Sequence, residues 1–246
     1  YATGLKARGT LNAARSSILG AFHLKSGKLI FTGGGSEADN QAIYSAYREG
    51  MKQNKKHMIT SAVEHHAVLH TLKKLEKEGF EVTYLDVSED GYVTAEQVEK
   101  AIKDETCLVT IMYANNEIGT IQPIKEIGAV CKAKGVLFHT DAVQAVGHVA
   151  IDVKEQNIDM LSLSAHKFHG PKGTGAFYCR KGISLVGLMQ GGAQERNKRP
   201  GTTNTPSIVA TAAALKKCCD EMDKNIFYYS KDNSSMEVDF VVQARD

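Results

Sequence analysis

Apolar and polar positions along the chain follow two alternating patterns, one typical of buried strands and the other of amphipathic helices. Short runs rich in β-branched and other apolar residues recur at intervals that leave room for a helix. The predicted strands cover residues 28–32, 57–63, 81–87, 107–114, 135–141, 160–165 and 175–180. The predicted helices cover residues 36–54, 66–79, 94–104 and 123–134, and a last one runs from Pro206 to Asp223.

This order of elements predicts an α/β fold. Strands that alternate with helices form a largely parallel sheet with helices on both faces, here a three-layer α/β/α domain with a mostly parallel seven-stranded sheet. Residues 94–97 read Thr-Ala-Glu-Gln, a capping-box pattern that marks a helix start. The strand at 175–180 follows a loop too short for a crossover helix, so we expect it to be antiparallel.

The C-terminal residues depart from the alternation. Residues 226–246 contain a strand-like piece, a polar turn and an apolar-periodic segment, and nothing upstream is an obvious pairing partner. We therefore interpret residues 1–225 as one large domain and residues 226–246 as the remnant of a small second domain.

Composition and charge narrow the function. The chain has 246 residues, 42% hydrophobic and 24% charged, which is typical of a globular protein. A formal net charge of +2 does not give the positive surface potential that nucleic-acid binding usually requires. No apolar run approaches the ~20 residues that span a bilayer, and the N-terminus has no signal-peptide pattern, so we expect a cytoplasmic protein.

The cysteines suggest reduced thiols with packing roles. They are odd in number, lack C-x-x-C spacing and fall mostly inside predicted elements. The five residues are Cys107, Cys131, Cys179, Cys218 and Cys219. A redox or metal pair at Cys218 and Cys219 is the alternative, but adjacent helical side chains point apart.

Polar clusters follow the predicted strands. In an open α/β sheet, ligands bind at the carboxyl ends of the strands. The clusters there read TGGGSE, EHH, NNE, TDAVQ and SAHK. In the first, glycines precede a helix beginning at Ser36, so backbone amides and the helix dipole can meet a single phosphate. The alternative is that the glycines only form a tight turn.

Two charged residues end apolar strands in the same sheet. Asp141 can pair with a protonated heteroaromatic nitrogen, or it can cap a helix beginning near Ala142. Gln144 follows three residues later, on the same side of the predicted crevice as Asp141. Lys167 lies between His166 and His169, where a desolvated amine with cationic neighbours becomes nucleophilic and can form a Schiff base. A phosphate loop, an aspartate and such a lysine meet the demands of pyridoxal 5'-phosphate (PLP).

Six motifs resemble, in order and spacing, those of the NifS-like cysteine desulfurases, which are class V aminotransferases of the fold type I PLP enzymes. The resemblance covers about residues 28–215. The motifs read TGGGSEADN, SAVEHHAV, YANNEIGTIQPI, FHTDAVQAVG, SAHKFHGPKGTGAFY and GGAQERNKRPGT. This implies conversion of L-cysteine to L-alanine, with sulfur carried as a persulfide to an acceptor protein in iron-sulfur or thiolation pathways.

The resemblance also implies a role for each matching position. Lys167 would hold PLP covalently, Asp141 would pair with the ring nitrogen, and His65 would stack on the ring and take part in proton transfer. The ring oxygen side would contact Asn116 and Gln144, and the phosphate would contact Gly35, Ser36, Ser164 and His166. Thr202 would reach the phosphate of a neighbouring subunit, which implies a homodimer. No metal is implied.

Two departures from the family pattern stand out. The glycine loop has Ser36 where the family usually has threonine, which keeps the hydroxyl. No cysteine matches the family's persulfide-forming residue, and the arginine for the substrate carboxylate is not matched either. We expect an intervening stretch between Asn225 and Ile226 to be absent, together with a segment before the opening helix-like residues 1–19.

Other functions stay open at this point. A selenocysteine lyase or another class V enzyme would share the lysine, the aspartate and the phosphate loop. A metal hydrolase using the His139/Asp141 and His166/His169 pairs would leave the glycine loop unused. A non-catalytic scaffold becomes plausible if the chain truly lacks the thiol.

Overall fold

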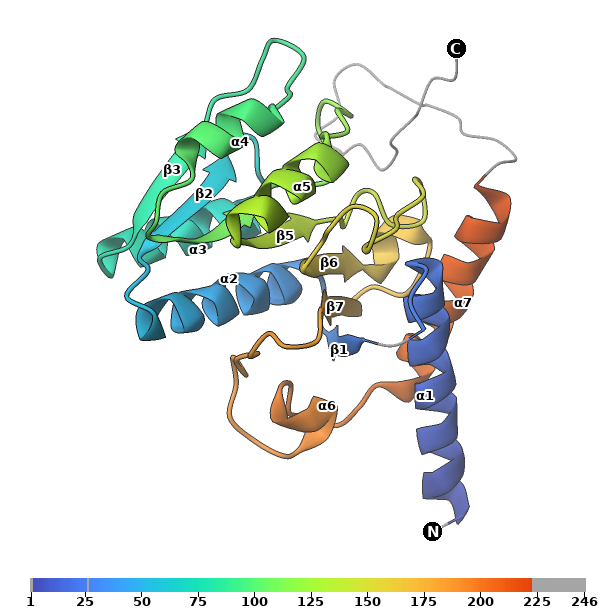
Figure 1. The fold of residues 1–246 in the computed structure, drawn as a ribbon. Helices are drawn as coiled ribbons and strands as arrows, with labels where there is room; N and C mark the ends of the chain where they lie inside the picture. The colour runs from blue at the N-terminus through green and yellow to red at the C-terminus, as the bar shows by residue number, and fades with distance from the viewer. Residues whose placement is uncertain (1, 26, 223–246) are drawn as a thin grey trace.

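The computed structural model describes residues 2–25 and 27–222, which form an α/β fold around one sheet (Figure 1). The seven strands lie in the order β1-β7-β6-β5-β4-β2-β3. Their bounds are β1 Lys28–Thr32, β2 His57–Ser61, β3 Glu81–Leu85, β4 Thr106–Thr110, β5 Leu137–Asp141, β6 Met160–Ser164 and β7 Gly175–Cys179. Every strand predicted from the sequence is present.

Strand directions agree with the predictions. β3, β2, β4, β5 and β6 pair in parallel, and β7 is antiparallel to both of its neighbours, β6 and β1. Because β1 and β6 are both antiparallel to β7, they run in the same direction. Their carboxyl ends therefore lie at the same edge of the sheet as those of the other parallel strands.

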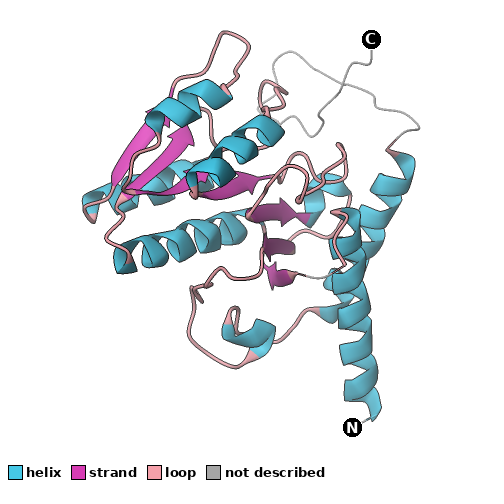
Figure 2. Cartoon of the chain, viewed as in Figure 1, coloured by secondary structure: helices cyan, strands magenta, loops and turns pink. Residues whose placement is uncertain are grey.

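Helices cover both faces of the sheet, which confirms the three-layer prediction (Figure 2). One core cluster contains Ile43 of α2 and Leu72 of α3, and the other contains Leu19 of α1, Ile127 of α5 and Leu215 of α7. The helices are α1 Ala2–Ala21, α2 Gly35–Lys52, α3 His66–Lys77, α4 Ala95–Ala101, α5 Ile124–Lys134, α6 Gln194–Asn197 and α7 Thr205–Glu221, with a 3₁₀ helix η1 at Ala165–Phe168.

Local signals explain several boundaries. Thr94 and Gln97 form both hydrogen bonds of the predicted capping box at the start of α4. The predicted helix 94–104 is too long, because Ile102 is already extended. The predicted strand 107–114 is also too long. β4 ends at Thr110, where its register with β2 and β5 ends, although the Tyr113 N–H still donates to the Asp141 carbonyl at 2.8 Å.

Two predictions concern residues that the structure does not describe. The remnant of a second domain at 226–246 lies outside the described residues, as does Asp223, the predicted end of the last helix.

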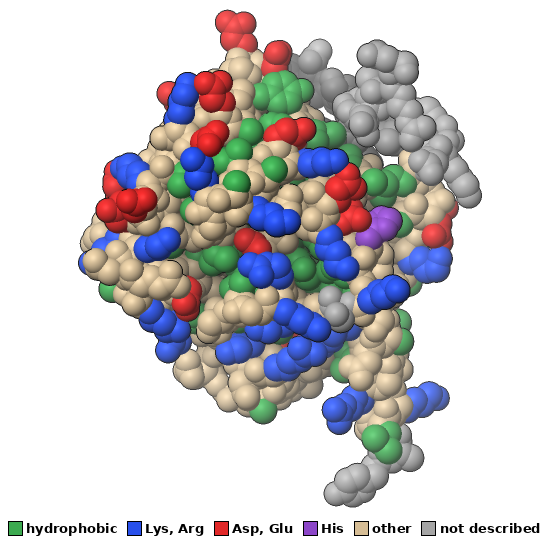
Figure 3. Space-filling view, viewed as in Figure 1, with side chains coloured by type: hydrophobic (Ala, Val, Ile, Leu, Met, Phe, Trp, Pro, Cys, Tyr) green, Lys and Arg blue, Asp and Glu red, His purple; other side chains and the backbone are tan. Residues whose placement is uncertain are grey.

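None of the helices in the described part is both long and apolar enough to cross a membrane. On the face shown in Figure 3, acidic and basic side chains are interspersed in the upper part, and Lys and Arg gather in the lower part.

Candidate active site

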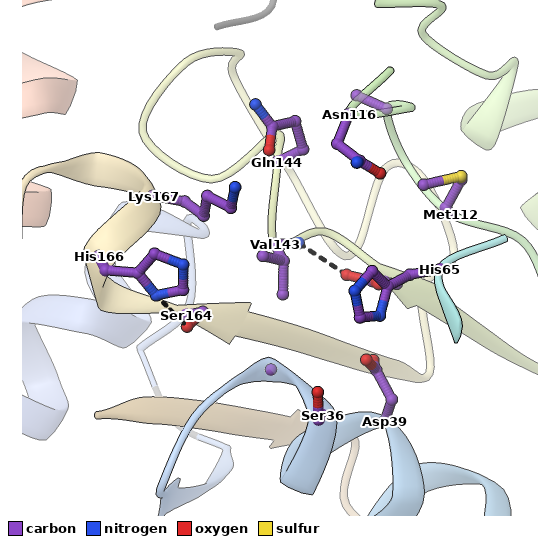
Figure 4. A pocket seen from close by; sticks show the side chains of 13 residues that line it. Ser36, Asp39, His65, Met112, Asn116, Val143, Gln144, Ser164, His166 and Lys167 are labelled. Carbon is purple, nitrogen blue, oxygen red and sulfur yellow. Dashed lines mark hydrogen bonds between the residues drawn. The ribbon is translucent and has the colours of Figure 1, made fainter. Parts of the chain in front are cut away.

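A cavity of about 190 Å³ lies at the carboxyl ends of β4, β5 and β6, beside the start of α2 (Figure 4). It contains every predicted cofactor residue except Thr202, which is exposed on the loop before α7. The lining residues are Gly35, Ser36, Asp39, His65, Met112, Ala114, Asn116, Asp141, Val143, Gln144, Ser164, His166 and Lys167. The structure thus brings together residues far apart in the sequence, as the strand-end rule predicts.

The glycine loop forms one wall of the cavity. α2 begins at Gly35, and the first N–H groups of a helix have no carbonyl partner within it. A Cβ at Gly35 would lie 2.5 Å from Val143 Cγ2, so only glycine lets the loop pack against the segment after β5. Glu37 fixes the turn: its Oε2 accepts from the Gly33 N–H at 2.7 Å, and Arg199 Nε donates to its Oε1 at 3.0 Å.

Lys167 lies on η1, in the connection between β6 and β7. It is 8% exposed, an unusual burial for a lysine. Backbone hydrogen bonds from Ala165 N–H to the Thr174 carbonyl and from Gly170 N–H to the Ala165 carbonyl close this connection. His148 Nε2 lies 2.8 Å from the Lys167 carbonyl oxygen. The lysine is therefore placed by a short, well-bonded turn, with its side chain directed into the cavity (Figure 4).

Ser164 and His166 flank the lysine on the side of the glycine loop. The Ser164 hydroxyl lies 2.9 Å from His166 Nδ1. Ser164 is buried at the end of β6, and His166 is exposed. His169 does not line the cavity; it ends η1 in a left-handed conformation with φ of 62°.

Asp141 lies at the end of β5, and the segment after it is a turn where a helix beginning near Ala142 was the predicted alternative. Its Oδ1 accepts from the Val143 N–H at 2.9 Å, which caps the turn after β5, while its side chain lines the cavity. Burial raises the pKa of the Asp141 carboxyl, and the Val143 N–H, His65 and Lys167 act in the opposite direction. A cation placed in the cavity would lower this pKa further and stabilise the carboxylate.

His65 forms the opposite wall. Its Nδ1 accepts from the Ala67 N–H at 3.1 Å, which makes His65 the N-cap of α3 and fixes the ring. Because Nδ1 accepts, the proton of a neutral ring sits on Nε2. Nearby, Asn115 Oδ1 accepts from the N–H groups of Glu117 and Ile118, and this turn carries Asn116 into the cavity lining.

Sequence reasoning missed four lining residues, Asp39, Met112, Ala114 and Val143. Asp39 follows Gly35 by four residues, one helical turn, so helix periodicity could have placed it on the same face. Glu64, next to the predicted His65, is also buried, and burial raises its pKa to about 8. Periodicity gives the face of the helix, but nothing in the sequence shows that either acid is buried and not solvated.

The structure separates the histidines considered as metal ligands: His139 lies within the sheet, and His166 lines the cavity. His139 is fully buried within the sheet, where Nδ1 lies 2.8 Å from Thr110 Oγ1 and Nε2 lies 2.9 Å from Ser162 Oγ. Burial lowers its pKa to about 3, so the ring is neutral. Within residues 2–25 and 27–222, the structure contains no group of three or more His, Cys, Asp or Glu placed to hold a metal ion.

None of the five cysteines lines the cavity. Burial raises the pKa of Cys107, Cys131 and Cys179 to about 12 in each case. It also raises the pKa of Cys218 and Cys219 on α7. Because the thiolate is the nucleophilic form, none of these thiols is activated, in agreement with the predicted packing roles.

Comparisons with known proteins point to one family. Residues 1–235 match the sequence profile of the family described as Aminotransferase class-V. The chain is 53% identical over 223 residues to "Cysteine desulfurase IscS" of Clostridium botulinum, covering 90% of this chain and 56% of that protein. It is 50% identical over 225 residues to the protein of the same name from Methanosarcina thermophila, covering 92% and 55%.

Solved structures share the fold. "SspA in complex with cysteine" superposes with a TM-score of 0.84 at 44% identity, over 88% of this chain and 62% of that one. A "NIFS-LIKE PROTEIN" superposes with a TM-score of 0.86 at 38% identity, over 90% and 61%. The chain thus spans a little over half the length of the curated relatives it matches.

The profile match covers most of the chain, and the fold agrees with that of the solved relatives. The expectation drawn from the six sequence motifs is therefore confirmed at the level of the family. The chain belongs to the class-V aminotransferase family and is similar, within it, to the cysteine desulfurases of the IscS and NifS type.

Proposed function

We propose that this cavity binds PLP and that the protein is a cysteine desulfurase, which converts L-cysteine to L-alanine and passes the sulfur to an acceptor. The observation that carries the proposal is the placement of a buried Lys167 in the same cavity as a buried Asp141. A lysine amine and a carboxylate at such positions are the two protein groups that PLP chemistry requires. The names of the relatives support the choice of cysteine as substrate.

The residues present fit this cofactor. The start of α2 suits a phosphate, and Gly35 leaves the close approach that a side chain would block. Asp39 also lines the cavity, and its buried Oδ1 has no hydrogen-bond partner, which is consistent with a site that takes a polar ligand. Donors, acceptors and the amine are therefore arranged for a small, anionic, aromatic group.

Each residue then has a defined task. Lys167 Nζ holds the cofactor covalently and, once released, moves protons at the substrate α-carbon. Asp141 holds a proton on the ring nitrogen, and the ring of His65, fixed by Ala67, covers one face. Asn116 and Gln144 contact the ring oxygen side. When bound, the cofactor supplies the sink for the electrons released at the substrate α-carbon.

The phosphate is held at the open end of the cavity. The backbone of Gly35 and the side chains of Ser36, Ser164 and His166 supply its donors. We also propose that Thr202 reaches the phosphate of a neighbouring subunit, because it is exposed and lies outside its own cavity. The protein would then act as a homodimer.

The nucleophile that takes the sulfur is not among the described thiols, whose pKa values are all raised. We therefore place it in a part of the protein beyond the described residues. The proposed organisation keeps residues 1–225 as the large cofactor-binding domain and assigns residues 226–246 to a second, small domain.

The test is covalent capture of the cofactor. Protein supplied with PLP should absorb near 400 nm, as expected for a lysine-bound cofactor, and borohydride should remove the band and fix the cofactor on Lys167, located by peptide mass spectrometry. Release of alanine and sulfide from cysteine then tests the substrate. A cofactor fixed on another lysine, or no binding by folded protein, would overturn the proposal.

A further inference from the structure

A second carboxyl group lies beside Asp141 in the cavity, and none of the roles above uses it. Asp39, on α2, is 1% exposed and lines the same cavity. Figure 4 shows its carboxyl directed upward from α2 into the space below His65. Its Oδ1 has no hydrogen-bond partner. A carboxyl group that lines a binding cavity and keeps a buried, unpartnered oxygen calls for an explanation.

The neighbours of Asp39 do not compensate a negative charge. Ser162 acts to lower the pKa of the carboxyl, but the buried Oδ1 has no hydrogen-bond partner. His139 Nε2 lies 3.7 Å from Oδ1, beyond hydrogen-bond distance, and the neutral ring supplies no positive charge. The charged groups with the largest effects on the pKa of Asp39 are two other acids, Asp141 and Glu64.

The groups behind this carboxyl are neutral. His139 Nε2 lies 2.9 Å from Ser162 Oγ, and His139 Nδ1 lies 2.8 Å from Thr110 Oγ1, so hydroxyl groups flank the neutral ring. Lys167 and His65 both lower the pKa of Asp141. Burial, together with the charges of Asp141 and Glu64, raises the pKa of Asp39 well above its ordinary value.

We propose that Asp39 is a positioning residue that keeps its own proton and presents it to the cavity, so that Asp141 is left as the carboxylate that meets the cationic ring nitrogen. Two adjacent buried carboxylates would repel each other, and one cation would neutralise only one of them. A neutral acid adds a hydrogen-bond donor without adding a second charge. This inference rests on the proposed function for the identity of the bound cation.

The proposal predicts that asparagine can replace Asp39 but not Asp141, because only Asp141 needs its charge. We measure PLP affinity by equilibrium dialysis at pH 7. Asp39→Asn keeps a neutral donor and should bind within about 3-fold of the wild type. Asp39→Ala removes the donor and should bind about 10-fold more weakly. Asp141→Asn, the matched control, should bind about 100-fold more weakly.

A second measurement uses protein without cofactor. The infrared difference spectrum of wild type minus Asp39→Asn at pH 7 should contain the carbonyl stretch of a protonated carboxyl group. In an Asp141→Asn background, the ionisation of Asp39 should move to lower pH, because the neighbouring charge has been removed. A purely structural role would not move this ionisation.

The outcomes separate the two proposals. Loss of binding in Asp39→Asn as large as in Asp141→Asn, or wild-type affinity in Asp39→Ala, overturns the role of Asp39. If Asp39→Asn does not fold, carbon NMR of the wild-type carboxyl decides: titration near the ordinary aspartate value of about 3.9 refutes the proposal. Absence of PLP binding by the folded wild type refutes the proposed function, while the infrared result still stands or falls by itself.

Discussion

The two ends of the cavity work by different physical means. At the inner end, Asp39 and Asp141 are buried, with exposed fractions of 1% and 5%, and Glu64 lies close by, also buried. At the outer end, Ser36 and His166 are exposed around the start of α2. Burial raises the pKa of each inner acid, whereas water remains available to the outer groups.

This difference teaches how each end selects its ligand. In the dry inner end, the number of charges decides what binds, because an unpaired charge is costly there. In the wet outer end, backbone shape decides, because water can replace a lost side-chain contact. Substitutions at the inner end should therefore have large, pH-dependent effects, and polar substitutions at the outer end should have small ones.

The largest effect is expected where the two ends meet, at Lys167. Lys167→Ala should abolish covalent cofactor capture and lower turnover at least about a thousandfold, because the nucleophilic amine and the proton carrier are lost together. Peptide mass after borohydride and alanine release measure both. Lys181→Ala, an exposed lysine after β7, is the control and should behave as the wild type. Retention of either property by Lys167→Ala would contradict the assignment.

The next effect tests the charge at the inner end. Asp141→Asn should lower turnover about 100-fold or more, because the ring nitrogen loses its only charge partner while the shape is kept. Steady-state kinetics at saturating PLP separates this loss from weaker binding. Asp86→Asn, an exposed acid, is the control. A loss of less than about 3-fold would show that the inner end does not depend on charge.

Gly35 tests shape at the outer end. Gly35→Ala should weaken PLP binding and cost about 1–3 kcal/mol of unfolding free energy, because its Cβ would lie 2.5 Å from Val143 Cγ2. The double variant with Val143→Ala should recover part of both. Gly20→Ala in α1, where a Cβ meets nothing within 4 Å, is the control. Failure of the double variant to recover would show that the contact is not the cause.

Glu64 tests burial at the inner end through pH. Its pKa is raised to about 8, so the folded protein holds this proton where the unfolded chain has lost it. That contribution to stability is present at acid pH and is lost as pH rises from the ordinary value to about 8. Glu64→Gln should therefore gain about 2–4 °C in melting temperature relative to the wild type between pH 5 and pH 8. An equal difference at both pH values would contradict the raised pKa.

The smallest effect is expected for an exposed hydroxyl at the outer end. Ser36→Ala should weaken PLP binding by only about 3-fold, because the backbone of α2 stays in place and water can occupy the space. Equilibrium dialysis measures the change. A loss as large as that of Asp141→Asn would erase the distinction between the two ends.

The sequence predicted the strands, the antiparallel β7 and most of the cavity, because apolar periodicity and the strand-end rule depend on neighbouring residues. Asp39 escaped because its local sequence looks the same whether the acid faces solvent or a cavity. The predicted strand 107–114 was too long for a different reason. Apolar character continues past Thr110, while the pairing that defines β4 does not. Such features depend on contacts between distant segments.

The position of β7 between β1 and β6 has a consequence for the newly made chain. β1 carries the glycine loop and β6 leads to Lys167, but by strand pairing the two are connected only through β7, which is last of the seven strands in sequence. Such long-range pairing forms late during folding. On the ribosome, β1 can therefore join the sheet only after β7 has emerged. Binding of a ligand at the glycine loop of the growing chain would report when β1 pairs with β7.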